Sequence, residues 1–340
     1  TVIIAEVMQK AEGNRRTTTE GSDAQVNAAL SLYALQRDIQ MSGYGLINEA
    51  DTLGCTIQAQ FDSHAARTLT LAPVIITPGA NATVSDSITV IRSGTNGYAV
   101  PVLTTISHAS TDTGFTVQST LGVQAGDLML ALPSAPSSTQ WCTLFTVRAD
   151  GSNTLSSTHI PHAVAANTWN PSTSIMPATY ATGTMLAKAS NLVQRTFAVS
   201  GGNLQSVHLQ VADDTTVTCT VGSNVVLMKA FYGKDTNSDG TVDQYDTTTP
   251  TTNAGWQQVR TVRIAVVARS TQREKDEVTT NNPTLDVGNT VSVSGSATCG
   301  SNKCITLQLS PLSGTNTEWR HYRYKVFDTV VPLRNVLWAS

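Results

Sequence analysis

The order of hydrophobic and polar positions divides the 340-residue chain into two unequal parts. From Asp23 to Met41 there is no Gly or Pro, as expected of a helix. Apolar residues recur there at spacings of four, three and four, at Ala28, Leu32, Leu35 and Ile39. This period places them on one helical face, which Ala29 and Tyr33 would widen. Ser22 or Asp23 would cap the start of the helix, and the glycines after Met41 would end it.

After Gly45, short runs rich in Val, Ile, Thr and Phe alternate with turn residues, a pattern typical of β-strands. The predicted strands are residues 68–71, 87–92, 115–117, 128–131, 144–147, 225–228, 259–268, 290–293, 305–309 and 321–331. Helices do not alternate with these strands, so we expect an antiparallel sheet. The segment from Ala149 to Thr184 is poor in charge and rich in Ser, Thr, Asn and Pro, which predicts long surface loops.

These patterns predict an α+β protein with two regions. Residues 1–45 form the N-terminal helix, which packs on an antiparallel β-sheet, and residues 46–340 form a β-rich globular head with room for two sub-lobes. The head would carry large β and loop insertions.

Composition narrows the class of protein. Charged residues make up only 13% of the chain and aromatic residues 6%, while Ser and Thr are abundant, which suits the surface of an exported protein. The formal net charge of −3 provides no electrostatic attraction to nucleic acid or to an anionic membrane. No run of about 20 apolar residues is present in the printed sequence.

The five cysteines suggest disulfides. Cys299 and Cys304 flank a short, turn-rich segment that a disulfide could close, as is common in exported proteins. Cys55 and Cys142 are a second candidate pair, which leaves Cys219 as the odd cysteine. The alternative is that all five are unpaired, buried thiols.

A loop at 235–246 has the spacing of a calcium site. Oxygen-bearing side chains fall at loop positions 1, 3, 5, 9 and 12, and position 7 would offer a backbone carbonyl, which gives Asp235, Asn237, Asp239, Asp243, Asp246 and Thr241. Gly240, at position 6, allows the sharp turn between them. Asp246 stands where an EF-hand has Glu, and the preceding residues predict a strand in place of a helix. We predict a structural Ca²⁺ here, and the alternative is an Asp/Asn/Gly turn without metal.

Motifs for catalysis are missing from the sequence. There is no GxSxG, GxGxxG or GxxxxGK pattern, and the close pair His159 and His162 lies in a Pro-bearing segment without a nearby Glu. The charge run 273–277 is typical of a solvated surface. Residues 319–327 interleave aromatic and basic side chains, as a nucleic-acid surface does, but the net charge of −3 favours a terminal strand with one packed and one solvated face. An enzyme is therefore not predicted.

Several segments resemble the PilW family of type IV pilus minor pilins. The most specific are 232–245 and 259–270, and the others are the helix end at 35–44, the strands at 87–90 and 126–130 with Cys142 soon after, and the closing segment 324–335. The resemblance extends over most of the chain, whereas the middle loops match poorly.

The resemblance implies a pilin-like fold and a structural role. A minor pilin would help to prime pilus assembly, take part in the tip complex, and contact other minor and major pilins and a tip adhesin. It would lie in the inner membrane and periplasm before assembly and in the extracellular pilus afterwards. Pilins reach the membrane through a hydrophobic half-helix with a processing site and an early Glu, and Val2 to Ala5 would be the end of such a helix.

Other classes share parts of this pattern. A type II secretion minor pseudopilin has the same architecture, although the C-terminal signature favours a pilin. A calcium-dependent adhesin or binding module would share the Ser/Thr-rich β surface and the calcium-type loop, but would not need the N-terminal helix. A calcium-dependent hydrolase has the least support, because no nucleophile and base are recognisable.

Overall fold

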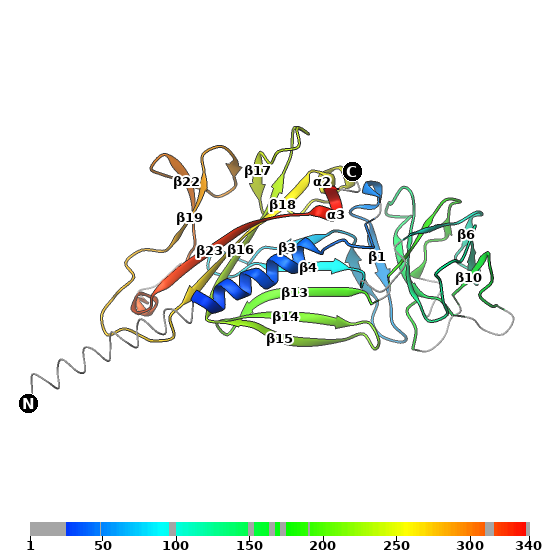
Figure 1. Cartoon of the computed structure of the whole chain (residues 1–340), viewed down its shortest axis with the longest axis horizontal. Coiled ribbons are helices and arrows are strands. Elements are labelled where there is room, and N and C mark those ends of the chain that lie inside the picture. Colours follow the sequence, from blue (N-terminus) through cyan, green and yellow to red (C-terminus); the bar gives the residue numbers. More distant parts are fainter. Residues whose placement is uncertain are drawn as a thin grey trace, which may run out of the picture.

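The computed structural model describes residues 25–47, 49–94, 100–148, 153–162, 167–170, 175–189, 191–309 and 316–337. Within them the protein consists mostly of β-sheets, with one long helix near the N-terminus (Figure 1). The predicted helix start, with Ser22 or Asp23 as its cap, lies outside the described residues. None of the described helices is both long enough and apolar enough to cross a membrane.

Residues 25–40 form the helix, and the predicted apolar face is its buried face. The relative exposure is 9% for Leu32 and 0% for Ala28, Leu35 and Ile39. The prediction that Ala29 and Tyr33 widen this face is wrong, because both side chains are exposed and Tyr33 retains 65% of its accessible surface. The buried stripe is therefore narrow, and a second face of the helix is left outside the core.

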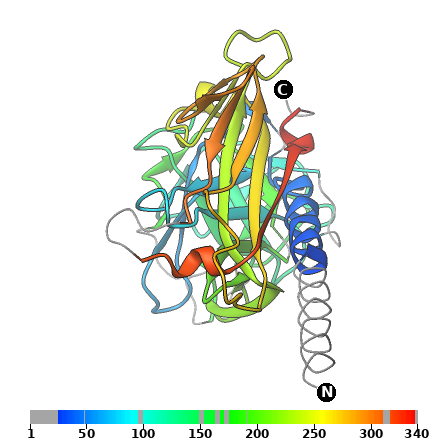
Figure 2. The same ribbon diagram turned by 90° about the vertical axis from the view of Figure 1, so that its left-hand side faces the viewer.

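Two five-stranded sheets lie next to the helix. The first is antiparallel throughout, in the order β15 (Thr215–Ser223), β14 (Asn203–Gln210), β13 (Val193–Ser200), β4 (Ser87–Arg92) and β3 (Val74–Thr77). The second has the order β20 (Ser292–Val293), β17 (Gln244–Asp246), β16 (Val225–Lys234), β18 (Val259–Arg269) and β23 (Tyr324–Pro332). Figure 2 shows the helix running alongside β23.

The remaining strands form a third sheet and smaller ones. A six-stranded sheet has the order β2 (Arg67–Thr70), β1 (Thr56–Ala59), β9 (Cys142–Thr146), β8 (Leu128–Leu132), β12 (Met185–Lys188) and β5 (Val102–Leu103). Pairs of strands join β10 (His159–Pro161) to β7 (Gly114–Thr116), and β11 (Thr179–Tyr180) to β6 (His108–Ala109). A three-stranded sheet contains β19 (Thr284–Gly288), β22 (Asn302–Thr306) and β21 (Ala297–Cys299). The short helices are η1 (Ala50–Thr52), α2 (Asn253–Gln257), η3 (Glu318–His321) and α3 (Arg334–Leu337).

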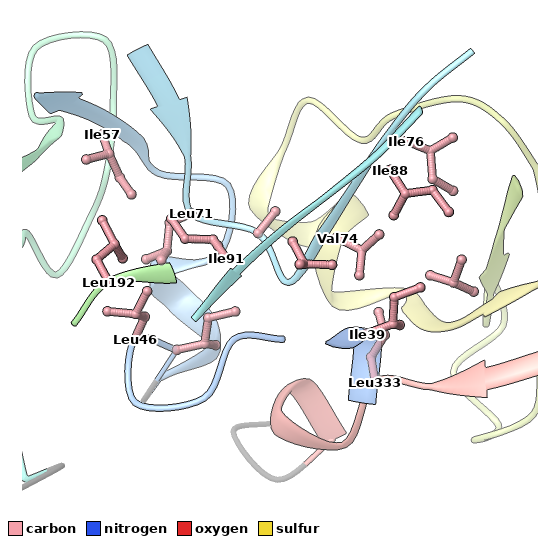
Figure 3. Close-up of a cluster of buried hydrophobic side chains, with 14 of the residues drawn as sticks. Ile39, Leu46, Ile57, Leu71, Val74, Ile76, Ile88, Ile91, Leu192 and Leu333 are labelled. Atoms are coloured by element: carbon pink, nitrogen blue, oxygen red, sulfur yellow. The ribbon is translucent and has the colours of Figure 1, made fainter. Parts of the chain in front are cut away.

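The largest buried cluster joins the helix to the sheets. Figure 3 shows Ile39 of the helix beside Leu333, with Val74, Ile76 and Ile88 of β3 and β4 in the same cluster. Two smaller clusters lie apart from it. One covers the other face of the six-stranded sheet and includes Phe115 and Tyr180, and the other lies between β16–β18 and the β19–β22 sheet.

Polar contacts fix the helix at its sides and at its end. Asp38 forms an ion pair with Arg195 of β13. At Gly222 of β15 an added Cβ would lie 1.7 Å from Ser31 Oγ, so only glycine permits this close approach of strand to helix. Gly43, at φ +77°, ends the helix as predicted and donates its N–H to the Ile91 carbonyl at 2.7 Å.

Several strand predictions are confirmed, and two features were not foreseen. The predicted strand 87–92 coincides with β4, and 259–268 is contained in β18. Strands β13 to β15 were missed, because their Thr, Gln and Ser residues lack a run of apolar positions. The antiparallel expectation holds except for the parallel pairs β1–β9 and β17–β20.

The prediction of surface loops from Ala149 to Thr184 is wrong for part of that segment. It contains β10 and β11, and the side chains of Ile160 and Tyr180 are fully buried. Isolated apolar residues of this polar segment are thus part of a hydrophobic core. The other residues of that core come from strands distant in the sequence.

Candidate functional site

The calcium-type loop is the turn of a β-hairpin. It connects β16 to β17, and Lys234 pairs with Gln244 at the base of the turn. Asp235 is 1% exposed, and its carboxylate accepts hydrogen bonds from the Asp239 N–H (3.1 Å) and the Gly240 N–H (3.0 Å). The loop backbone is therefore wrapped around the carboxylate of its first residue.

Of the other loop residues, Asn237, Asp239 and Thr241 are exposed to solvent, whereas Asp243 is half-buried. Asn237 Oδ1 accepts from the Asp239 N–H, and Asp239 Oδ1 accepts from the Thr241 N–H and hydroxyl. The hydrogen bond from the Thr241 hydroxyl is the main cause that lowers the pKa of Asp239. Asp243 accepts from the Thr236 N–H at 2.9 Å and from the Thr236 hydroxyl at 2.7 Å.

Asp246 lies at the base of the hairpin, where a lysine holds it. Lys234 Nζ contacts its two carboxylate oxygens at 2.7 and 2.8 Å, and the Thr248 N–H adds a bond at 2.8 Å. Arg260 Nε lies 3.5 Å from Asp235 Oδ2. The loop spacing did not indicate these two cations, because Lys234 adjoins the motif and Arg260 belongs to another strand.

The loop offers the type of ligand that calcium prefers, but its carboxylates are not arranged around one point. Carboxylate and carbonyl oxygens are the ligands that Ca²⁺ prefers. The described residues, which include all of 235–246, nevertheless contain no group of three or more His, Cys, Asp or Glu side chains placed to hold a metal ion. The loop carboxylates instead accept hydrogen bonds from the loop itself, and calcium binding stays a prediction.

Both candidate cysteine pairs are joined in the structure. Cys55 is bonded to Cys142, which ties the start of β1 to β9, and Cys299 is bonded to Cys304 around the β21–β22 turn. Cys219 is a free, exposed cysteine on β15. Two disulfides fit an exported protein.

The two histidines near β10 have different surroundings. His159 Nε2 contacts Asn153 Oδ1 at 2.7 Å, whereas His162 Nε2 lies 2.7 Å from His108 Nε2 inside the core beside Phe115. Burial, with a smaller effect of His108, lowers the pKa of His162 to about 3, and burial also lowers the pKa of His108. The sequence did not indicate this pair, because its members are 54 positions apart in the chain.

The charge run and the aromatic–basic segment neutralise each other. Glu274 pairs with Arg323, Glu277 with Arg320, and Arg273 with Glu318. Arg320 of η3 and Arg323, just before β23, are thus engaged by carboxylates of the charge run.

The outward face of the helix carries apolar side chains. Val26, Leu30 and Tyr33 are 54%, 60% and 65% exposed, and their spacings of four and three place them on one side of the helix. We call these three residues the outer stripe. It lies on the opposite side of the helix from the buried face, and large exposed apolar residues at helical spacing are typical of a contact surface.

The second half of the chain is similar in sequence to a known protein family. Residues 179–335 match the model of a family described as Type IV Pilus-assembly protein W. No curated protein matches the sequence. Among solved structures, a type IV-like pilin from Thermus thermophilus, TTHA1219, is 10% identical, with 92% of this chain and 97% of that chain covered at a TM-score of 0.36. That low score does not define the fold, and the resemblance rests on the sequence match. Over residues 179–335, which contain the hairpin loop, β18 and β23, the chain is thus confirmed as similar to the PilW family of type IV pilus assembly proteins.

Proposed function

We propose that this protein is a structural minor pilin of a type IV pilus, which helps to prime assembly and contributes to the tip complex. The family match over residues 179–335 supports a role in pilus assembly. The proposal assigns the chain no catalytic role. Its partners would be other minor and major pilins and a tip adhesin. It would reside in the inner membrane and periplasm before assembly and in the extracellular pilus afterwards.

The outer stripe is the observation that carries this proposal. One face of the helix is buried in the head, so the helix is fixed in position, while Val26, Leu30 and Tyr33 project from the opposite face. An apolar helix face of this kind gains free energy when another helix covers it. A fixed helix with two apolar faces can therefore bind its own head and a neighbouring subunit at the same time.

A charged substitution in the outer stripe tests the role. We expect deletion of the gene to reduce surface pili, wild-type protein to restore them, and Leu30→Asp to fail, because the carboxylate would be buried against the neighbouring helix. Leu121→Asp is the matched control, since Leu121 is 79% exposed and lies outside the helix. Thermal melting should show that both variants fold.

The outcomes separate the candidate functions. Normal pili after deletion, or full restoration by Leu30→Asp, would contradict the proposal. Normal pili together with a loss of protein secretion would identify a type II secretion pseudopilin instead.

We further propose that the hairpin loop binds a structural Ca²⁺ through Asp235, Asn237, Asp239, Asp243 and the Thr241 carbonyl, with Asp246 shared between the ion and Lys234. The ion would neutralise the clustered carboxylates and stiffen the turn. Three aspartates lie within nine residues of this turn, and Arg260 is the cation nearest to Asp235. Hard oxygen donors at this spacing support calcium over softer metals.

Titration calorimetry tests the calcium proposal. Calcium should release or absorb heat and raise the melting temperature, with a stabilisation of about 2.7 kcal/mol at 100 times the dissociation constant. Asp239→Asn should weaken binding. Asp213→Asn is a matched control, because Asp213 accepts the same N–H and hydroxyl bonds from Thr215 as Asp239 does from Thr241. No heat, or equal responses of the two variants, would rule the site out.

A further inference from the structure

Strand β15 forms an exposed edge of the first five-stranded sheet. It is the outermost strand in Figure 1, and β14 is its only pairing partner among the described strands. Residues 215–220 are all exposed, including Val217 at 44%. The N–H and C=O groups along its outer side are left to pair with solvent or with another strand.

The composition of β15 does not protect this edge. Its sequence, TTVTCTVGS, contains no charged residue and no proline, and β-branched residues dominate. Strand β23 is also nine residues long and outermost in its sheet, yet it contains Lys325, Asp328 and Pro332, residue types that discourage edge pairing. A long, uncharged and exposed edge such as β15, in contrast to the protected edge β23 of the other sheet, indicates a surface for strand addition.

The sequence of β15 is nearly symmetric about Cys219. Thr218 and Thr220 flank the cysteine, Val217 and Val221 come next, and Thr215 and Ser223 end the strand. We propose that β15 pairs antiparallel with β15 of a second copy of this chain, with Cys219 on the two-fold axis. Thr218 then lies opposite Thr220 and Val217 opposite Val221, pairs that stabilise a sheet, while Thr216 lies opposite Gly222 and Thr215 opposite Ser223. Because such a contact is isologous, it closes with two copies and gives a dimer.

Strand β15 contains a β-bulge, which lies outside the central residue pairs of the proposed dimer. The register with β14 shifts between Leu204 and Gln205, which leaves Val221 as an extra residue. Pairing with β14 is regular from Thr215 to Thr220. The central pairs of the dimer, formed by Thr218, Cys219 and Thr220, therefore use only regular strand.

The free cysteine provides a direct probe of this register. Residues directly opposite in an antiparallel pair have Cα atoms about 4.5–5.5 Å apart, a distance that a disulfide can span. Cys219 is exposed and unpaired, so the two thiols of a dimer can react. Oxidised glutathione accepts two electrons and two protons from the two Cys219 thiols, and the products are one intermolecular disulfide and two glutathione thiols.

Cross-linking of the full chain tests the proposed register. With oxidised glutathione, a reducible dimer of 36.0 kDa chains should form through Cys219 and be absent from Cys219→Ser. The matched control is Thr216→Cys in the Cys219→Ser background. The two introduced thiols would be exposed but separated by six residues along the ladder, about 20 Å, so they should not cross-link. Equal cross-linking of the control would overturn the proposal, because it would show random collision.

A charge exchange tests the pairing without oxidation, with mass measured by light scattering over a concentration series. In Cys219→Ser, the double change T218K/T220K places lysines opposite each other across the axis and should lower dimer formation about fivefold. T218K/T220E places lysine opposite glutamate and should restore it. If the Cys219→Ser protein without charge changes is monomeric at every concentration, the proposal is overturned. Equal dimer formation by the two charge variants would overturn it as well.

Discussion

Replacement of Cys55 and Cys142 by alanine is expected to lower the free energy of unfolding by about 4.6 kcal/mol. The disulfide closes a segment of 87 residues, and the loss of unfolded-state entropy grows with the length of the closed loop. It also joins the start of β1 to β9, which pair in parallel. Denaturant unfolding without reductant, followed by tryptophan fluorescence, measures the effect.

The second disulfide is the matched control for this result. Cys299 and Cys304 are only five positions apart, so their replacement should cost only about 2 kcal/mol. Alanine is used in both variants because Cys55 and Cys142 are buried, where a serine hydroxyl would need a new partner. Equal losses in the two variants would show that loop length does not set the contribution of these bonds.

The second large effect is a loss of stability in mild acid, caused by the buried His108–His162 pair. Their Nε2 atoms lie 2.7 Å apart, so one ring donates an N–H and the other accepts it, and protonation would place two donors face to face. The pKa of His162 is lowered to about 3, below the value of about 6.5 in the unfolded chain. The unfolded chain thus binds more protons, so stability is complete above pH 6.5 and falls as the pH decreases toward 3.

Comparison with His162→Gln isolates this effect. Glutamine can keep a hydrogen bond to His108 but does not titrate. Between pH 6.5 and 5, the slope of unfolding free energy against pH should be smaller in the variant by about 1 kcal/mol per pH unit. His208, whose pKa is also lowered by burial, is present in both proteins and cancels in the comparison. The same slope in both would contradict the assignment.

The helix could be predicted because its signal is local. Four apolar residues at helical spacing are enough to define a buried face, and Ala28, Leu32, Leu35 and Ile39 form that face. The exposure of Tyr33 could not be predicted, because it depends on how far the sheets extend around the helix. In the same way, Leu30 is apolar and yet 60% exposed.

The residues of the candidate loop could be listed from the sequence, but their contacts could not, and calcium binding there stays a prediction. The spacing of oxygen side chains is a local property, and the hairpin turn brings Asp235, Asn237 and Asp239 together. The ion pair between Arg260 and Asp235 joins different strands, so no sequence window contains it. The pair of His108 and His162 was missed for the same reason.

The sequence by itself determined the helix face, the main apolar strands, the pairing candidates among the cysteines and the likeness to a pilus assembly family. These depend on the period of side chains along one segment or on short motifs. The tertiary structure alone decided the polar strands β13 to β15, the buried histidine pair and the free edge at Cys219. A Thr-rich strand lacks an apolar period, so its pairing follows from neighbouring strands, and an edge exists only once the order of strands in the sheet is fixed.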